Sequence, residues 1–95
     1  MILARVCGTV VATRCTDGVP AARYLLANPT DQHGAAKSGA IIALDTVGAG
    51  IDELVLVAQG SSARQTAVSD KKAIDAVIIG IVDLVEETGT VTYRK

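Results

Sequence analysis

Short apolar runs with period-two alternation recur along the 95-residue chain, and Gly, Pro, Asn and Asp separate them. Helical periodicity is nearly absent, so the pattern indicates a mainly β protein. The predicted strands cover residues 2–13, 22–27, 40–45, 53–58, 75–86 and 91–95. A polar loop is predicted over residues 30–39, and Ser62 followed by Gln65 has the spacing of a helix N-cap, which favours a short helical turn there.

The first predicted strand, residues 2–13, has one wholly apolar face. Gly8 lies in the middle of this face, where a missing side chain permits a bulge or a sharp bend. Long strands with a central glycine suit a small closed barrel, because one strand must bend to pair at both of its ends.

The predicted strand over residues 75–86 is apolar on both faces, apart from Asp83. In a small barrel one face packs on the core, so the outer face is predicted to pack on another subunit. A carboxylate within such a strand must be paired or hydrogen-bonded, and we therefore expect Asp83 to meet an Arg or backbone donors across a subunit boundary.

Five strands with a short helical insert before the last one have the element order of an OB-like barrel. The predicted fold is thus a single domain over residues 1–95: a small five-stranded antiparallel barrel with one or two short helical turns.

Composition adds that the core is aliphatic and that the chain favours self-association. The AVILMFWYC residues make up 49% of the chain, yet it has no Phe, no Trp and only two Tyr. The mean hydropathy of +0.40 is high for a small soluble monomer. Apolar surface buried between copies of the chain would account for this excess.

The charge balance argues against nucleic acid and membranes as partners. Nine Lys and Arg face ten Asp and Glu, and the sequence pI is about 5.6, so the basic footprint of a nucleic-acid binder is missing. Apolar runs such as residues 76–79 fall far short of the roughly 20 residues that a membrane helix needs. The N-terminus reads as a strand rather than a signal peptide, which favours a cytosolic location.

Candidate catalytic and ligand-binding motifs have simpler structural readings. The G-x-G of residues 48–50 lacks the third glycine and the helix of a dinucleotide fold, and the GSSAR segment lacks the ending of a P-loop. Gly48 and Gly50 are better explained as turn residues with positive φ, and Ser61 and Ser62 as capping residues. We expect no catalytic residues and no cofactor.

The two cysteines, Cys7 and Cys15, are expected to be reduced thiols. On one straight strand they would lie about 26 Å apart at about 3.3 Å per residue, beyond disulfide reach. With His33 as the only histidine, the ligands of a zinc site are lacking, and we expect no metal. Scattered acids at strand ends are expected to be solvated or paired with arginines.

Three segments taken together go beyond generic β sequence: MILARVCGTVVATR, ALDTVGAGIDELVLVAQGSSAR and DAVIIGIVDLVE. They closely resemble the EutN/CcmL family, the pentameric vertex proteins of bacterial microcompartment shells, from Met1 to about Glu86. The resemblance implies an OB-like barrel, a five-fold ring, no enzymatic activity, and a role in closing the corners of a cytoplasmic polyhedral shell. The implied partners are further copies of the chain and the hexameric and trimeric shell proteins.

By the same resemblance, two segments are assigned to subunit contacts and the axial region: residues 48–50 and residues 60–64. Asp45 is expected to pair with Arg64, and the doubly apolar strand adds its own residues to the predicted interface. The full set is Asp45, Gly48, Ala49, Gly50, Gly60, Ser61, Ser62, Arg64, Gly80, Ile81 and Asp83.

Two other functions stay open at this point. A free-standing OB-type module for an oligonucleotide or small ligand would need a basic, aromatic barrel face, which the composition does not supply. A small enzyme built on Cys7 or Cys15 would need an activated thiol.

Overall fold

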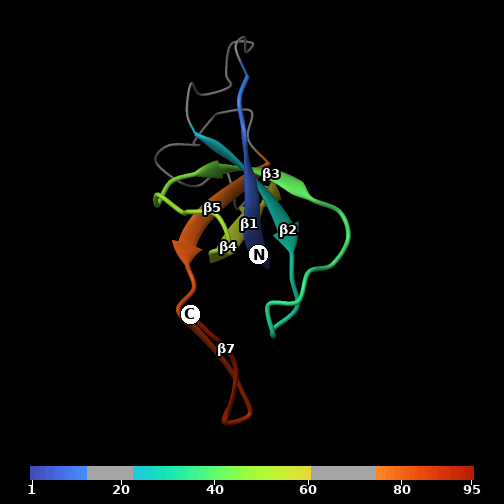
Figure 1. Cartoon of the computed structure of the whole chain (residues 1–95), viewed down its shortest axis with the longest axis vertical. Helices are drawn as coiled ribbons and strands as arrows, with labels where there is room; N and C mark the ends of the chain where they lie inside the picture. The colour runs from blue at the N-terminus through green and yellow to red at the C-terminus, as the bar shows by residue number, and fades with distance from the viewer. Residues whose placement is uncertain (13–22, 61–74) are drawn as a thin grey trace.

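A closed barrel of five strands forms the body of the molecule (Figure 1) in the computed structural model, which describes residues 1–12, 23–60 and 75–95. The barrel strands are β1 (Ile2–Val10), β2 (Tyr24–Pro29), β3 (Ile41–Asp45), β4 (Leu54–Gln59) and β5 (Ala76–Ile81). Their order around the barrel is β1-β2-β3-β5-β4. A separate hairpin follows, made of β6 (Leu84–Glu87) and β7 (Thr90–Arg94). The mainly β prediction and the closed barrel are confirmed.

Strand β1 closes the barrel by pairing with two neighbours. Its first residues pair with β4 and its length from Ala4 onward pairs with β2. The β1–β2 register shifts between Val6 and Gly8, which leaves Cys7 as the extra residue of a bulge. The predicted bulge at the central glycine is confirmed, and it supplies the bend that lets one strand serve both neighbours.

One pairing differs from the all-antiparallel prediction, because β3 and β5 run parallel, with Leu44 opposite Val77. Two strands that close a barrel after a long connection need not alternate in direction, and no local pattern in β3 or β5 encodes this choice. The predicted helical turn near Ser62 lies outside the described residues.

The barrel interior is filled by small and branched aliphatic side chains, as the composition predicted. Leu25 of β2, Val57 of β4 and Ile78 of β5 are fully buried at its centre. The complete inner cluster is Ala4, Val6, Leu25, Ala27, Ala43, Ala49, Val55, Val57, Ala76 and Ile78.

The outer face of β5 is covered within the chain itself. Val77 is completely buried, and it packs with Leu44 and Ala58 in a second cluster. The side chains of Tyr24 and Ile79 pack against this cluster. The expectation that another subunit covers this whole face is therefore wrong for the first half of β5. The last three residues of β5, Ile79, Gly80 and Ile81, remain partly exposed.

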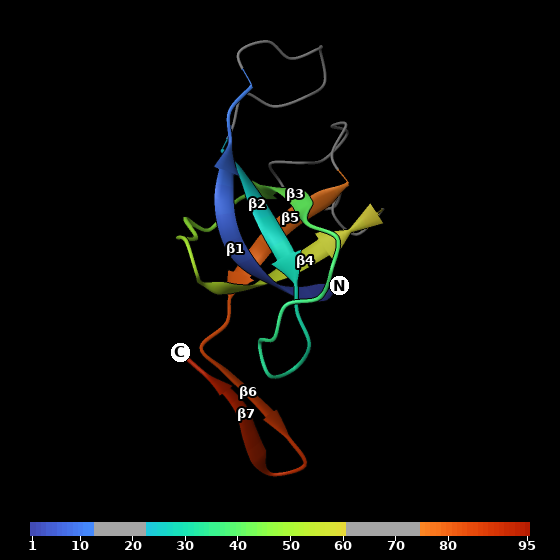
Figure 2. The same ribbon diagram turned by 45° about the vertical axis from the view of Figure 1, so that its right-hand side comes forward.

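The single strand predicted over residues 75–86 is wrong in its second half. β5 ends at Ile81, and the chain leaves the barrel through Val82 and Asp83 into the β6–β7 hairpin, which stands away from the barrel in Figure 2. The reason is the length of β4, the antiparallel partner of β5. β4 begins at Leu54 and Val55 pairs with Ile81, so β4 has almost no residues left to pair with the chain after Ile81. The apolar pattern continues in the sequence beyond Ile81, but the strand does not, because it has no partner there.

Candidate functional site

The loop between β3 and β4 is organised by Asp45, the last residue of β3. Its Oδ1 accepts hydrogen bonds from the backbone N–H groups of Val47, Gly48 and Ala49 at 3.1, 3.1 and 3.2 Å. The Asp45 side chain is only 2% exposed. An aspartate that accepts from N–H groups two to four residues onward is a typical turn former, so the Asp-Thr-Val-Gly order does signal this loop.

Arg23 completes the environment of Asp45. Its Nη1 lies 3.0 Å from Asp45 Oδ2, while half of the arginine side chain stays exposed. The general prediction that such acids pair with arginines is confirmed here. Arg64, the specific partner expected for Asp45, lies outside the described residues, as do Ser61 and Ser62.

The small residues of this loop have different structural reasons. Gly48 has φ +75°, a left-handed conformation that favours glycine, which confirms its predicted turn role. Gly50 does not have a positive φ. Its N–H donates to Glu53 Oε1, and a Cβ added at Gly50 would lie 3.2 Å from that oxygen. Ala49 is fully buried in the barrel core. Sequence reasoning missed Asp52, which takes the positive φ (+68°) that was expected of Gly50.

The other predicted site residues lie at both ends of the β4–β5 pair. Gly60 has φ +64°, and its N–H donates to the carbonyl of Asp75 at 2.8 Å, which closes the end of β4. Gly80 pairs with Leu56, whose Cδ1 would lie 3.6 Å from an added Cβ. Ile81 packs partly on the inner cluster. The loop after β3 joins β3 to β4, and both of these strands pair with β5.

Asp83 is not the buried carboxylate that the sequence predicted. Its side chain is 83% exposed, and its Oδ1 lies 3.9 Å from Lys95 Nζ. Asp83 follows the end of β5 instead of lying within a packed strand, so its predicted place in the strand is wrong. Its expected contact across a subunit boundary stays a prediction.

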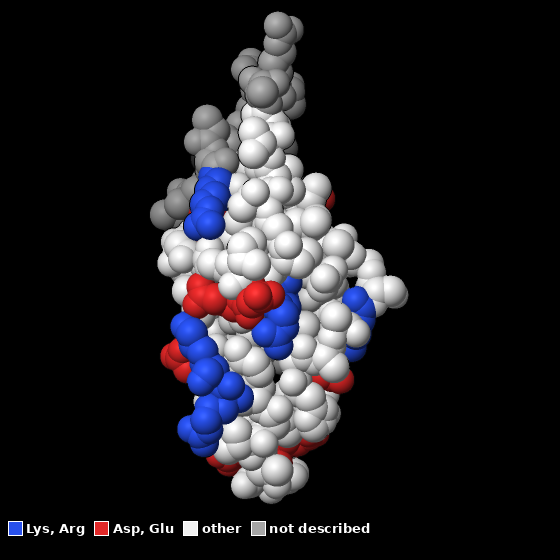
Figure 3. Space-filling model, viewed as in Figure 1, with Lys and Arg blue, Asp and Glu red and all other residues white. Residues whose placement is uncertain are grey.

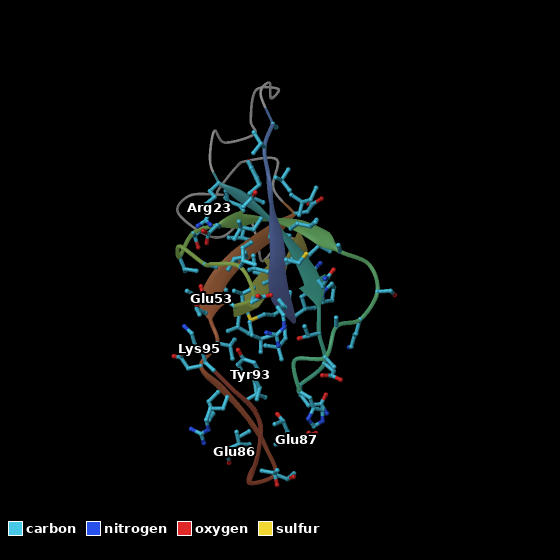
Figure 4. The ribbon with its side chains drawn as sticks, viewed as in Figure 1. Arg23, Glu53, Glu86, Glu87, Tyr93 and Lys95 are labelled. Atoms are coloured by element: carbon cyan, nitrogen blue, oxygen red, sulfur yellow. The ribbon has the colours of Figure 1, made fainter. Side chains whose placement is uncertain are left out.

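Glu53 and Lys95 form an ion pair that sequence reasoning missed, and no local signal links residues so far apart in the chain. Lys95 Nζ lies 2.9 Å from Glu53 Oε2, and Figure 4 shows the two side chains together at the junction of barrel and hairpin. The hydrogen bond from Lys95, followed by that from the Gly50 N–H, lowers the pKa of Glu53 below its ordinary value, and the same bond raises the pKa of Lys95.

The loop before β3 is closed by Asp31 in a similar way to the loop after it. Asp31 Oδ1 accepts from the N–H groups of His33 and Ala35 at 2.8 and 3.0 Å. The bonds from Ala35 and then His33 lower the pKa of the Asp31 carboxyl. This carboxylate stabilises the turn that brings Gly34 back toward β1.

Among the described residues, no group of three or more His, Cys, Asp or Glu is placed to hold a metal ion. Cys7 is an exposed free thiol whose Sγ lies 3.4 Å from the Leu26 carbonyl oxygen, and Cys15 lies outside the described residues. No helix in the described part of the chain is long and apolar enough to cross a membrane.

The surface gives no sign of a nucleic-acid interface on the face that Figure 3 presents, where acidic and basic side chains lie interspersed. Neither tyrosine offers an open stacking platform. Tyr24 packs against the second core cluster, and the Tyr93 ring lies against Arg5. The described residues therefore show none of the stacking surface that an OB-type binding module for single strands would use.

Residues 1–83 match the family described as "Ethanolamine utilisation protein EutN/carboxysome". The carboxysome shell vertex protein CcmL of Gloeobacter violaceus is 41% identical over 95 residues, which cover 100% of this chain and 95% of that protein. The solved structure of Gloeobacter violaceus CcmL has a TM-score of 0.93, over 100% of this chain and 98% of that one.

Relatives from other microcompartments are about equally similar. The shell vertex protein EutN of Escherichia coli is 38% identical over 100% of both chains. The structure described as the GrpN pentameric microcompartment shell protein from Rhodospirillum rubrum is 38% identical, with a TM-score of 0.81 over 92% of this chain and 100% of that one. The chain therefore belongs to the EutN/CcmL family of bacterial microcompartment shell vertex proteins.

Proposed function

We propose that five copies of this chain form a ring that closes a vertex of a polyhedral microcompartment shell, where its rim meets hexameric and trimeric shell proteins. The observation that carries this proposal is the full-length similarity to shell vertex proteins, one of them described as pentameric. A shell vertex protein acts as a structural component and not as an enzyme.

Exposed apolar side chains support burial of this surface between copies. Ile42 of β3 is 56% exposed, and Val47 and Ile51 in the following loop are 39% and 53% exposed. These three side chains come from one ten-residue stretch, next to the turn that Asp45 holds in place. Burying apolar area contributes roughly 25 cal/mol per Å² toward association, against which the lost freedom of the separate chains is set.

The subunit interface that we propose combines the loop of residues 45–50, residues 60–64 and the end of β5 at Gly80, Ile81 and Asp83. Within this set Asp45 and Ala49 act by shaping the loop, because their side chains are already buried in their own chain. Gly80, Ile81 and Asp83 retain the exposure needed to meet a neighbour. A ring needs two different patches on each subunit, and the angle between them sets the number of copies.

Native mass spectrometry of the full chain tests the ring directly. A five-subunit species is expected, and a monomer at micromolar concentration would overturn the proposal. Gly80→Arg and Ile81→Asp are expected to reduce the pentamer, since each places charge in a packed β surface. Ser38→Asp, which adds charge to an exposed loop residue, is the matched control.

Circular dichroism of each variant separates lost assembly from lost folding, which matters because Ile81 also packs on the core. A folded Gly80→Arg monomer supports the proposed interface, and unchanged pentamers in both variants would place it elsewhere. Co-expression with hexameric shell proteins, followed by electron microscopy, tests the vertex role. Closed particles with this chain and open ones without it are the expected result.

A further inference from the structure

The β6–β7 hairpin is attached to the barrel without sharing its core. The family match ends at residue 83 and β6 begins at Leu84, so the hairpin lies just beyond the matched region. No residue from Leu84 to Arg94 is buried, and Figure 2 shows the hairpin projecting from one end of the barrel. Whatever holds it in place must therefore consist of surface contacts.

The first contact is a stack of Arg5, Gly34 and Tyr93. Arg5 of β1 donates from Nη1 to the Asp52 carbonyl at 2.9 Å and from Nη2 to the Gly34 carbonyl at 3.1 Å. Its Cζ lies 5.7 Å from the centroid of the Tyr93 ring of β7, within cation–π range. One guanidinium thus joins β1, the loop before β3, the loop after it and the hairpin.

Gly34 is required for this stack. A Cβ at Gly34 would lie 2.7 Å from Arg5 Nη2 and 3.2 Å from Tyr93 Cδ1, and its φ is +81°. A side chain here would be strained by this φ and would require the Arg5 guanidinium or the Tyr93 ring to shift. The loop is therefore shaped to admit both groups at once.

Three polar contacts complete the attachment. Lys95, directly after β7, pairs with Glu53 beside the start of β4. On the other side of the hairpin, Thr92 Oγ1 donates to the Gln32 carbonyl at 2.7 Å, and Gln32 Nε2 donates to Glu87 Oε2 at 3.1 Å. Figure 4 shows Tyr93, Lys95 and Glu87 spread along the hairpin, so the contacts reach over much of its length.

These contacts are weak compared with those that close the barrel. Exposed ion pairs and cation–π contacts contribute little individually and are screened by salt. An isolated two-stranded hairpin is marginally stable at best, so β6 and β7 depend on docking. Elements with few buried apolar contacts open at lower cost than the core strands.

We infer that the hairpin is a polar strap that docks reversibly on the barrel and opens as a unit while β1–β5 stay closed. When docked it holds the turn around Gly34 and the loop around Asp52 and Glu53 through Arg5 and Lys95. When open it releases the Arg5 guanidinium and the Glu53 carboxylate on the barrel surface. The strap does not depend on the proposed ring, since every contact that carries it lies within one chain.

Hydrogen–deuterium exchange with mass spectrometry on the full-length protein tests the strap. Hairpin amides are expected to exchange at least about tenfold faster than those of β4. Raising the salt from about 0.1 M to 1 M shortens the screening length from about 10 Å to about 3 Å and should speed exchange in the hairpin alone. Equal protection of hairpin and β4, or no effect of salt, would overturn the inference.

Three substitutions identify the contacts. Tyr93→Leu and Lys95→Met should each speed hairpin exchange about two- to fivefold, with β4 unchanged. Tyr93→Phe keeps the ring and should restore protection. Arg94→Met is the control, because Arg94 is an exposed cation of the same strand for which the described residues show no ion pair.

The outcomes separate this inference from the proposed function. Faster exchange of hairpin and barrel together in the variants, or an equal effect of Arg94→Met, would overturn the strap. Native mass spectrometry of the same samples reports the ring independently, so a pentamer with a non-opening hairpin counts only against the strap. A monomer with an opening hairpin counts only against the ring.

Discussion

Asp45→Ala tests whether one carboxylate organises the loop between β3 and β4. The wild-type side chain is nearly buried and accepts three backbone hydrogen bonds on Oδ1, while Oδ2 pairs with Arg23. Alanine removes all four contacts and leaves the loop N–H groups without their acceptor. The loop then has no internal reason to keep its shape next to β4.

The expected loss follows from these contacts. A hydrogen bond to a charged group contributes about 1.5–3 kcal/mol, but the three donors share one oxygen, and N–H groups near the surface regain water. The half-exposed Arg23 pair adds about 0–1 kcal/mol. We expect a total loss of about 2–4 kcal/mol, which lowers the Tm of a domain of this size by roughly 10–30 °C.

Thermal unfolding followed by circular dichroism at one fixed protein concentration measures this loss, because assembly makes the Tm depend on concentration. Asp45→Asn keeps an acceptor oxygen and should lose less than alanine. Arg23→Ala removes only the ion pair and should cost about 1 kcal/mol or less. A Tm of Asp45→Ala within about 2 °C of the wild type would refute the reasoning. Equal losses in Asp45→Ala and Arg23→Ala would show that the ion pair, not the backbone bonds, stabilises the loop.

Three further predictions concern the core, the turns and acid stability. Leu25→Ala should lower the free energy of unfolding by about 2–5 kcal/mol in chemical denaturation, because this fully buried side chain leaves a cavity at the barrel centre; a loss under 1 kcal/mol would contradict the packed core. Gly48→Ala should cost about 1 kcal/mol through its positive φ alone, since an added Cβ meets nothing within 4 Å, and a stabilising effect would contradict the turn assignment. The lowered pKa of Glu53 means that its contribution is present above its ordinary pKa of 4.5 and is lost as the pH falls through the lower folded-state pKa. Glu53→Gln should therefore flatten the acid limb of the stability curve, and identical acid limbs would contradict the ion pair with Lys95.

The strands that pair with neighbours along their whole length were predictable from alternation. The predictions for β2, β3 and β4 differ from the observed bounds by one or two residues, and the bulge beside Gly8 followed from one missing side chain. Such features depend on residues close together in the chain. The Asp45 turn belongs with them, because its acceptor and donors lie within four residues.

Features that depend on distant partners were not predictable in the same way. The sequence over residues 75–86 reads as one strand, yet it is split because β4 offers no further partner after Ile81. The burial of Val77 depends on Leu44 and Ala58 from two other strands. Arg5 and Tyr93 come from distant strands and meet beside Gly34, where an added Cβ would crowd both side chains.

The sequence by itself determined the strand content, the aliphatic core, the bulge of β1 and, through its signature segments, the family. Each of these follows from local alternation, from side-chain type or from resemblance. The tertiary structure alone decided the parallel β3–β5 pairing, the end of β5, the exposure of Asp83 and the docking of the hairpin. These features depend on which strands lie side by side. The residues of one strand do not determine the length or direction of the strand that pairs with it.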